Sequence, residues 1–132
     1  MLVTSFVSSC GASKAALIHL SRCAAMELGE DNIRVNSISP GGIATGIFGK
    51  AMGMDPLAAE ASAEKAKLAL ARAQTIPRAG LPLDIANAAV FLASDESSFV
   101  NGEDIVVDGG LIWGRRFSEV VAGSQSMRAL FD

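Results

Sequence analysis

Two stretches of the sequence hold side chains whose types and spacing could do chemistry. The first contains Cys10 and Lys14, which lie four residues apart at the start of a run of good helix formers that ends near Gly29. Residues at this spacing share one face of a helix, so a thiol and an ammonium group would face the same ligand. A thiol beside a lysine and near a helix N-terminus is a typical setting for a reactive cysteine. This pair is therefore a candidate catalytic site.

The second stretch is the glycine-rich segment Pro40-Gly-Gly-Ile-Ala-Thr45. It follows Ile33-Arg-Val-Asn-Ser-Ile-Ser39, an apolar run with several β-branched residues that predicts a buried strand. Glycines allow the backbone to approach a ligand closely. In open α/β sheets, ligands bind beyond the carboxyl ends of the strands, which is where this segment lies. The pattern predicts an α/β fold with a ligand site at residues 40–45.

The other elements must position these two stretches. Residues 2–9 have strand composition and form a candidate short leading strand. Gly29 is expected to end the first helix in a left-handed conformation, and Pro82 with Asp84 to begin a later helix. The predicted elements are a helix over 12–29, a strand over 33–39, a helical segment within 46–76, a helix over 82–95 with Ile85, Ala88, Ala89, Leu92 and Ala93 on its buried face, and a strand over 104–108. The last two strands are predicted to be parallel.

Length and composition limit the class of protein. A chain of 132 residues is typical of one domain, and a mean hydropathy of +0.37 suits a buried α/β core. The net charge of −3 and the pI near 5.1 argue against a nucleic acid or an anionic membrane surface as partner. No apolar run approaches the ~20 residues of a membrane helix, and no secretory signal follows Met1.

The cysteines indicate a reducing environment. Cys10 and Cys23 would lie on or beside one helix, roughly 20 Å apart at ~1.5 Å per residue, which is too far for an intrachain disulfide. The only histidine, His19, would lie about 13 Å along the helix from Cys10, which argues against a Cys–His nucleophilic pair. We therefore expect a cytoplasmic setting, and no metal site is predicted.

Several short segments form an ordered set between residues 10 and 112. They are Ser13-Lys-Ala-Ala-Leu17, Glu27-Leu-Gly29, Ile33-Arg-Val-Asn36, Pro40-Gly41, Pro77-Arg-Ala-Gly80, Asp84-Ile-Ala86, Phe91-Leu-Ala-Ser-Asp95, Phe99-Val-Asn-Gly102 and Val107-Asp-Gly-Gly110. In order and spacing they resemble the C-terminal half of a short-chain dehydrogenase/reductase. The resemblance implies the C-terminal portion of a Rossmann-like, doubly wound parallel sheet, with few strands flanked by helices.

The resemblance also implies a domain organisation. It places a partial Rossmann-like domain at 1–112, with a substrate lid at about 46–76, and leaves the tail 113–132 unassigned. The family fold needs about twice this length, and its G-x-G-x-x-G phosphate-binding motif is missing from the sequence. The expectation is a fragment whose strands lack neighbours and which exposes apolar surface.

Family members use a Tyr-x-x-x-Lys motif, in which the tyrosine hydroxyl exchanges a proton with the substrate oxygen and the lysine binds the nicotinamide ribose. Lys14 matches the lysine, but Cys10 occupies the tyrosine position and the chain contains no tyrosine. The resemblance assigns the cofactor, NAD or NADP, to Lys14, Pro40, Gly41, Ile43 and Thr45. The Ile43 backbone would hold the nicotinamide carboxamide, and Thr45 would contact the carboxamide or a phosphate.

The proton-transfer position is the main departure from the family. Cys10 is shorter than tyrosine by most of a ring, so a thiol would stop several Å from the substrate oxygen. It is either a substitute proton donor or a packed or merely reactive thiol. Ser8 and Ser9 stand too close to Cys10 to match the family's catalytic serine, which precedes the tyrosine by about a dozen residues. Either a loop between them is deleted or these serines are unrelated strand-end residues.

The sequence supports two hypotheses of different classes. The first is an NAD(P)-dependent oxidoreductase of a small-molecule secondary alcohol or ketone, truncated and catalytically impaired. The second is a non-enzymatic remnant that associates as a homo-oligomer, or with related subunits, through exposed apolar faces.

Under both hypotheses, Asn36 and Asp108 match structural motifs of the family. Asp108 is expected to hold the last strand and its turn, not to act as an acid or base.

Overall fold

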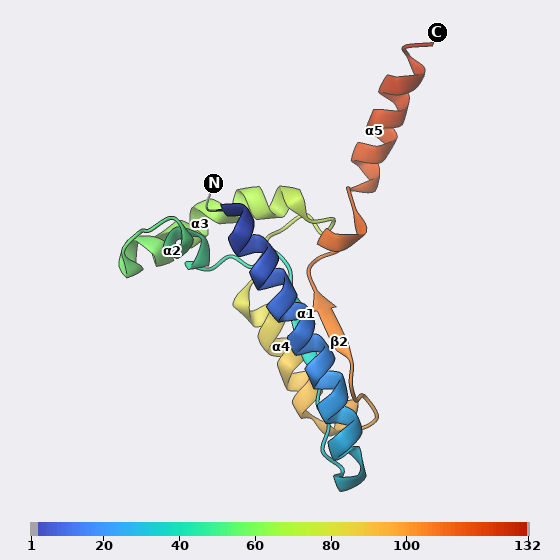
Figure 1. Cartoon of the computed structure of the whole chain (residues 1–132). Coiled ribbons are helices and arrows are strands. Elements are labelled where there is room, and N and C mark those ends of the chain that lie inside the picture. The colour runs from blue at the N-terminus through green and yellow to red at the C-terminus, as the bar shows by residue number, and fades with distance from the viewer. Residues whose placement is uncertain (1–2, 132) are drawn as a thin grey trace. The chain divides into compact units, whose positions relative to one another are not determined.

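The computed structural model describes residues 3–131, which divide into two compact units. The first unit comprises residues 3–39 and Asn87–Ile105, and the second comprises Pro40–Ala86 and residues 106–131. Figure 1 shows the elements along the chain: α1 (Val3–Leu28), β1 (Ser37–Pro40), α2 (Ile47–Ala51), α3 (Pro56–Ala73), α4 (Pro82–Ala93), β2 (Asp104–Val107) and α5 (Phe117–Arg128), with single 3₁₀ turns at Gly29–Asp31, Asp95–Ser97 and Leu111–Trp113.

Helix α1 begins earlier than the sequence predicts. The candidate leading strand at residues 2–9 is wrong, because Val3 and the residues after it continue the helix without a break; Leu2 lies outside the described residues. Serine, threonine and valine lower helix stability by only a few tenths of a kcal/mol each. Once a helix has formed, every further residue adds a hydrogen bond, so extension outweighs this weak local preference.

The end of α1 also differs in detail from the prediction. The left-handed residue is Asn32, with φ 57°, whereas Gly29 begins a 3₁₀ turn without a positive φ. The N–H of Asn32 donates to the C=O of Gly29 (3.0 Å), and the N–H of Ile33 donates to that of Leu28 (3.2 Å). Asparagine tolerates the left-handed region better than other residues with a side chain, so the chain turns three residues later than expected.

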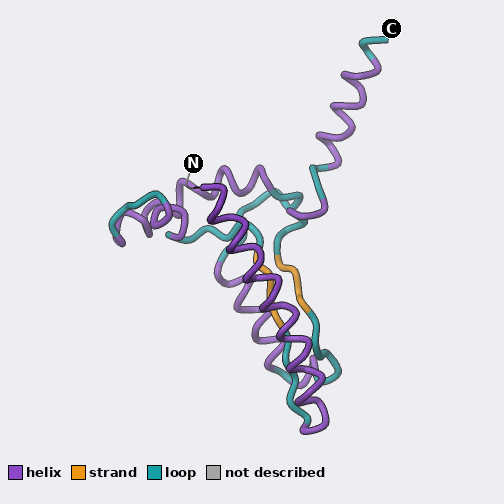
Figure 2. Tube along the Cα trace, viewed as in Figure 1, coloured by secondary structure: helices purple, strands orange, loops and turns teal. Residues whose placement is uncertain are grey.

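Strands β1 and β2 form a two-stranded sheet (Figure 2). The N–H of Ser37 donates to the C=O of Glu103 (2.8 Å), and the N–H of Gly41 donates to that of Val107 (3.0 Å). The partners advance in the same direction along both strands, so the pairing is parallel, as predicted. Residues 33–36 are not strand: the N–H of Val35 instead donates to the side-chain oxygen of Asn101 (2.9 Å).

The buried apolar side chains of the described residues are all alanines: Ala25, Ala44, Ala59 and Ala79. Large apolar side chains are instead widely exposed, among them Met26, Leu57, Val90, Phe99 and Trp113. The predicted buried face of α4 is only half-buried at Ile85, Ala88 and Leu92, and Ala89 and Ala93 are exposed. Two strands offer too little surface to cover helices on both faces, so the predicted exposure of apolar surface is confirmed.

Within the second unit, α2 and α3 form the predicted helical segment that follows the glycine-rich loop. Asp55 caps α3 by accepting the N–H groups of Leu57 and Ala58 (3.1 Å each), and Pro56 opens the helix. A β-carbon on Gly49 of α2 would stand 2.7 Å from the Cα of Ala59, so the two helices meet at small residues. None of the helices within residues 3–131 combines the length and apolar character that crossing a bilayer requires.

Candidate functional site

The glycine-rich loop is fixed by a parallel β-bridge between Ile43 and Gly80. The N–H of Gly80 donates to the C=O of Gly42 (3.0 Å), and the N–H of Ala44 donates to the C=O of Gly80 (2.8 Å). In an extended segment the peptide groups of alternate residues point to opposite sides. Ile43 therefore turns its own N–H and C=O away from Gly80, and among the described residues neither group has a hydrogen-bond partner.

The glycines of this loop have a packing role. A β-carbon on Gly41 would stand 2.5 Å from the Cα of Asp108, and one on Gly42 would stand 2.8 Å from Cδ2 of Leu70. Neither glycine has a positive φ. Both positions therefore require glycine because other parts of the protein approach the backbone closely, and this packing explains them without any ligand.

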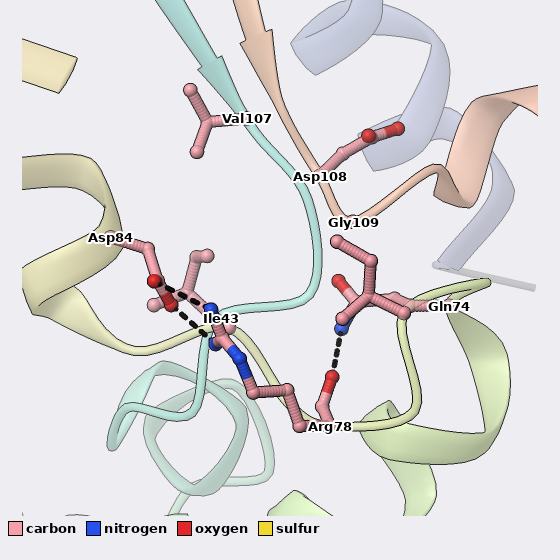
Figure 3. A pocket seen from close by; sticks show the side chains of 9 residues that line it. Ile43, Gln74, Arg78, Asp84, Val107, Asp108 and Gly109 are labelled. Carbon is pink, nitrogen blue, oxygen red and sulfur yellow. Dashed lines mark hydrogen bonds and ion pairs between the residues drawn. The ribbon is translucent and has the colours of Figure 1, made fainter.

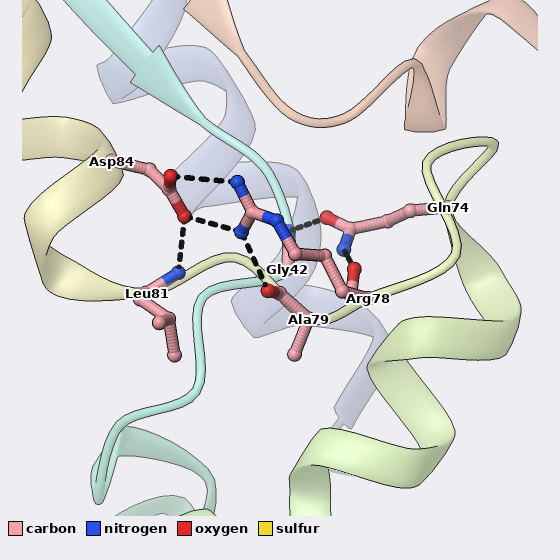
Figure 4. Close-up of polar contacts among 6 residues, drawn as sticks. All are labelled: Gly42, Gln74, Arg78, Ala79, Leu81 and Asp84. Atoms are coloured by element: carbon pink, nitrogen blue, oxygen red, sulfur yellow. Dashed lines mark hydrogen bonds and ion pairs between the residues drawn. The ribbon is translucent and has the colours of Figure 1, made fainter.

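A buried glutamine and an ion pair hold the loop from one side (Figure 4). Oε1 of Gln74 accepts the N–H of Gly42 (3.0 Å), and Nε2 donates to the C=O of Arg78 (3.0 Å). The Arg78 guanidinium donates two hydrogen bonds to the Asp84 carboxylate, at 2.7 and 2.8 Å. The same carboxylate accepts the N–H of Leu81 (2.7 Å), so Asp84 also caps the first turn of α4.

The charge state of Asp84 follows from these contacts. The hydrogen bonds from the Arg78 guanidinium, then the one from the Leu81 N–H, hold the pKa of Asp84 down at about 2, against an ordinary value of 3.8. The same pairing raises the pKa of Arg78. The two side chains are therefore a charged, bidentate pair at neutral pH, and neither is suited to exchange protons with a substrate.

A small cavity of about 100 Å³ lies against this network (Figure 3). Its walls are formed by Ile43, Gln74, Ile76, Arg78, Gly80, Asp84, Val107, Asp108 and Gly109. Ligand pockets usually enclose roughly 300–1,000 Å³, so this cavity is too small to enclose a dinucleotide or a drug-sized ligand. Ile43 is one of its lining residues, so the cavity lies beside the glycine-rich loop.

Asp108 has the structural role that the sequence predicted. Its side chain is 7% exposed, and its carboxylate accepts the N–H groups of Gly110 (2.7 Å) and Ile112 (2.9 Å). Gly109 and Gly110 have φ of 60° and 81°, so both glycines in this turn adopt the left-handed conformation. The carboxylate thus closes the turn after β2, and its oxygens are occupied by the backbone.

Asn36 is also structural, and Arg34 supports the same region. The amide of Asn36 donates to the C=O of Val100 (2.9 Å) and accepts the N–H of Glu103 (3.0 Å). The Arg34 guanidinium donates to the carbonyls of Leu92 and Val100, at 2.7 and 3.2 Å. These contacts tie the approach to β1 to the approach to β2 within the first unit.

Cys10 and Lys14 both lie on α1 and are exposed, one helical turn apart as predicted. The C=O of Cys10 accepts the hydroxyl of Ser13 (2.8 Å), and both Cys10 and Cys23 are free thiols. Ser8 and Ser9 lie on the same helix and not at the end of a strand. Across the described part of the chain, no group of three or more His, Cys, Asp and Glu residues is placed to hold a metal ion.

The predicted cofactor residues therefore fall into two groups. Lys14 belongs to the first unit, and Pro40, Gly41, Ile43 and Thr45 belong to the second. The Thr45 hydroxyl accepts only a long hydrogen bond from the N–H of Ile47 (3.5 Å) and is half-buried. Sequence reasoning missed Gln74 and its link to Arg78, because a polar residue just after a helix carries no sign of burial.

Three comparisons place this geometry among known proteins. The family model described as enoyl-(acyl carrier protein) reductase matches residues 2–112. Momilactone A synthase of Oryza sativa subsp. japonica is 48% identical over 100 residues, which cover 75% of this chain and 34% of that protein. The 7alpha-hydroxysteroid dehydrogenase of Escherichia coli (strain K12) is 43% identical over 104 residues, or 79% of this chain and 37% of that protein.

The comparison with solved structures finds the same kind of protein as the sequence comparisons. A solved 4-hydroxyisoleucine dehydrogenase complexed with NADH superposes with a TM-score of 0.58 at 38% identity, over 79% of this chain and 38% of that one. The chain thus spans little more than a third of the length of the proteins it matches. The ordered motifs, the parallel β1–β2 pair and the extent of the family match together show that the chain belongs to the short-chain dehydrogenase/reductase family.

Proposed function

We propose that the chain forms the nicotinamide-binding part of an NAD(P)-dependent oxidoreductase of a secondary alcohol or ketone. The observation that carries this proposal is the free edge of Ile43, which lies between the bonded N–H and C=O of Gly42 and the bonded N–H of Ala44. A nicotinamide carboxamide has one acceptor oxygen and an amide donor, so it complements a backbone N–H and C=O presented together. The dehydrogenase names of the relatives and the NADH in the solved neighbour support the same class of cofactor.

The loop residues of the second unit fit the nicotinamide end of such a cofactor. The Ile43 backbone would bind the carboxamide, and the half-buried Thr45 hydroxyl would bind the carboxamide or a phosphate oxygen. Pro40 and Gly41 would shape the bend that carries them. Lys14 is exposed and would bind the ribose hydroxyls as a donor. When bound, the nicotinamide supplies hydride transfer, which no side chain can supply.

Proton transfer is the step that Cys10 impairs. The thiol is exposed on α1 one turn before Lys14, where family members carry a tyrosine hydroxyl. A thiol there ends several Å short of a phenol, beyond hydrogen-bond reach of an oxygen that a tyrosine would contact. We therefore propose that the chain binds the nicotinamide end of its cofactor but gives no measurable turnover of a secondary alcohol by itself, because its sequence also contains no G-x-G-x-x-G motif to position the cofactor phosphates.

Calorimetric titration with NAD and with NADP tests this function. We expect one of them to bind, and Lys14→Met to weaken that binding. Lys65→Met, which removes an exposed lysine from α3, should leave the affinity unchanged. If neither cofactor binds to the unmodified chain, the oxidoreductase proposal is wrong.

The exposed apolar side chains favour a second candidate, a non-enzymatic cytoplasmic protein that works by association. Phe99 is 104% exposed and Trp113 is 84% exposed, although both are large apolar residues. Contiguous apolar surface of this kind marks sites of association with another protein, so this candidate requires that the exposed side chains form such patches. If no cofactor binds while the chain forms a defined oligomer, this candidate replaces the first.

A further inference from the structure

Gln74 is an unusual residue in this chain because it is polar and almost fully buried. It lies directly after α3, and only 2% of its surface is exposed. An uncompensated buried amide costs several kcal/mol, so such side chains persist where both of their ends are bonded. The large apolar residues of the same unit are mostly exposed, so the burial of this amide is a specific feature of the loop region.

Both ends of the Gln74 amide are bonded to backbone groups, which fixes its orientation. Only Oε1 can accept the N–H of Gly42, and only Nε2 can donate to the C=O of Arg78. Figure 4 shows this chain of bonds running from Asp84 through Arg78 and Gln74 to Gly42. The N-terminal turn of α4 and the glycine-rich loop are therefore connected through one side chain.

Glycines and an arginine lie close around Gln74. A β-carbon on Gly42 would stand 3.3 Å from Oε1, and one on Gly109 would stand 3.5 Å from the β-carbon of Gln74. The C=O of Gln74 accepts Nε of Arg116 (3.1 Å), and the Arg116 guanidinium also donates to the C=O of Ala71. Two glycines and one arginine thus hold the glutamine against the loop.

The consequence appears at the neighbouring residue. Gly42 donates its N–H to Gln74 and accepts Gly80 at its C=O, while Ala44 donates its N–H to Gly80. The bridge to Gly80 turns the N–H and C=O of Ile43 to the opposite side, and the N–H of Gly41 is held by the C=O of Val107. Between these two fixed points lies the Gly41–Gly42 peptide, whose N–H is bonded only to Gln74 among the described residues.

We propose that Gln74 is a positioning residue for the nicotinamide carboxamide: its buried amide anchors the Gly41–Gly42 peptide at the entry to the Ile43–Gly80 bridge, and so steadies the segment on which Ile43 presents its N–H and C=O together. The inference rests on the proposed function, because it assigns the carboxamide to Ile43. Gln74 touches no ligand itself. It acts through the segment that carries Ile43, so its effect should depend on the chemical group that Ile43 recognises.

The test compares Gln74→Met with the unmodified chain, and Gln125→Met on α5 serves as the matched control at an exposed glutamine. Amide hydrogen exchange reports the N–H of Gly42, and calorimetry reports binding of NAD, of NADP and of their analogues with an acetyl group in place of the carboxamide. We expect exchange at Gly42 to rise at least about tenfold in Gln74→Met and affinity for the natural cofactor to fall about tenfold. Affinity for the acetyl analogue, which lacks the amide donor, should fall much less. A merely structural role would weaken both ligands equally.

The outcomes separate this inference from the proposed function. If neither NAD nor NADP binds to the unmodified chain, the proposed function fails, and exchange at Gly42 still reports whether Gln74 holds the loop. If the cofactor binds, two results would overturn the inference: Gln74→Met lowers the affinity for the natural and the acetyl forms equally, or it changes neither affinity.

If Gln74→Met does not fold, Gln74→Glu replaces it. At about pH 5 the buried carboxylic acid can still accept and donate a hydrogen bond, whereas at about pH 9 its ionised form cannot donate. Carboxamide selectivity should then be lost at the higher pH, and selectivity that is unchanged between the two pH values would contradict the proposal.

Discussion

A β-carbon added to Gly41 would lie 2.5 Å from the Cα of Asp108, closer than real β-carbon contacts come. The loop after β1 and the turn after β2 therefore pass each other backbone to backbone. The Asp108 carboxylate fixes one side of this contact through the N–H groups of Gly110 and Ile112. On the other side, the N–H of Gly41 donates to the C=O of Val107, so neither chain segment can withdraw without breaking hydrogen bonds.

Gly41→Ala should therefore destabilise the protein. Insertion of a methyl group against fixed backbone typically lowers the free energy of unfolding by about 1–3 kcal/mol. Gly123→Ala is the matched control, because nothing lies within 4 Å of its added carbon and it sits inside α5. That change should leave stability unchanged or raise it by up to about 1 kcal/mol. Urea denaturation of the two variants measures both effects, and equal stability of the two would contradict the packing described.

The Arg78–Asp84 pair should make stability depend on acidic pH. The folded pKa of Asp84, about 2, is lower than its ordinary value of 3.8, so the folded state binds the proton less readily. The contribution is fully present above about pH 4 and disappears as the pH falls through about 2. Asp84→Asn should thus lower the melting temperature at neutral pH and approach the unmodified chain near pH 2.

Glu64→Gln provides the control for that experiment, since it also removes one carboxylate from an ion pair with a single cationic side chain. Glu64 and Lys67 form a contact on the exposed surface of α3, where solvent screens the charges. This variant should show little change in melting temperature at any pH. A pH profile for Asp84→Asn that runs parallel to that of the unmodified chain would show that the pair does not contribute as described.

Cys10→Tyr should restore proton transfer where a cofactor is held. In a chimera of this chain with the dinucleotide-binding half of a relative, we expect turnover of a secondary alcohol to rise about 10²- to 10⁴-fold, the usual gain from a positioned acid or base. In this chain alone, the substitution should give no measurable cofactor-dependent oxidation. Cys10→Phe in the same chimera adds the ring without the hydroxyl and should remain inactive. A spectrophotometric assay of cofactor reduction measures the activity of each of these proteins. Robust activity in the unmodified chain would show that Cys10 does not limit the reaction.

The exposed apolar side chains should make the chain self-associate or bind a hydrophobic dye. The fully exposed Phe99 is the clearest example. Phe99→Ser removes no buried contact, so the free energy of unfolding should change by no more than about 0.5 kcal/mol, while dye fluorescence falls. Sedimentation velocity and dye titration measure these properties. A monomer that unfolds cooperatively and binds no dye would argue against the association candidate.

The sequence by itself determined the features that depend on neighbouring residues. Pro82 and Asp84 begin α4 as predicted, because a proline at the first position and an acid in the first turn suit any helix. The order of the motifs indicated the family, and the parallel pairing of β1 and β2 was predicted from the fold of that family, not from local sequence. The spacing of Cys10 and Lys14 placed both on one face of α1, since that relation needs only helical geometry.

Only the tertiary structure decided the features that join distant parts of the chain. The left-handed turn at Asn32, the bridge from Ile43 to Gly80 and the burial of Gln74 each depend on what lies opposite in space. Local sequence fixes which groups can donate or accept, but burial and hydrogen-bond partners arise when residues far apart in the chain meet. For that reason the glycines of the loop were visible in the sequence, whereas the glutamine that orients them was not.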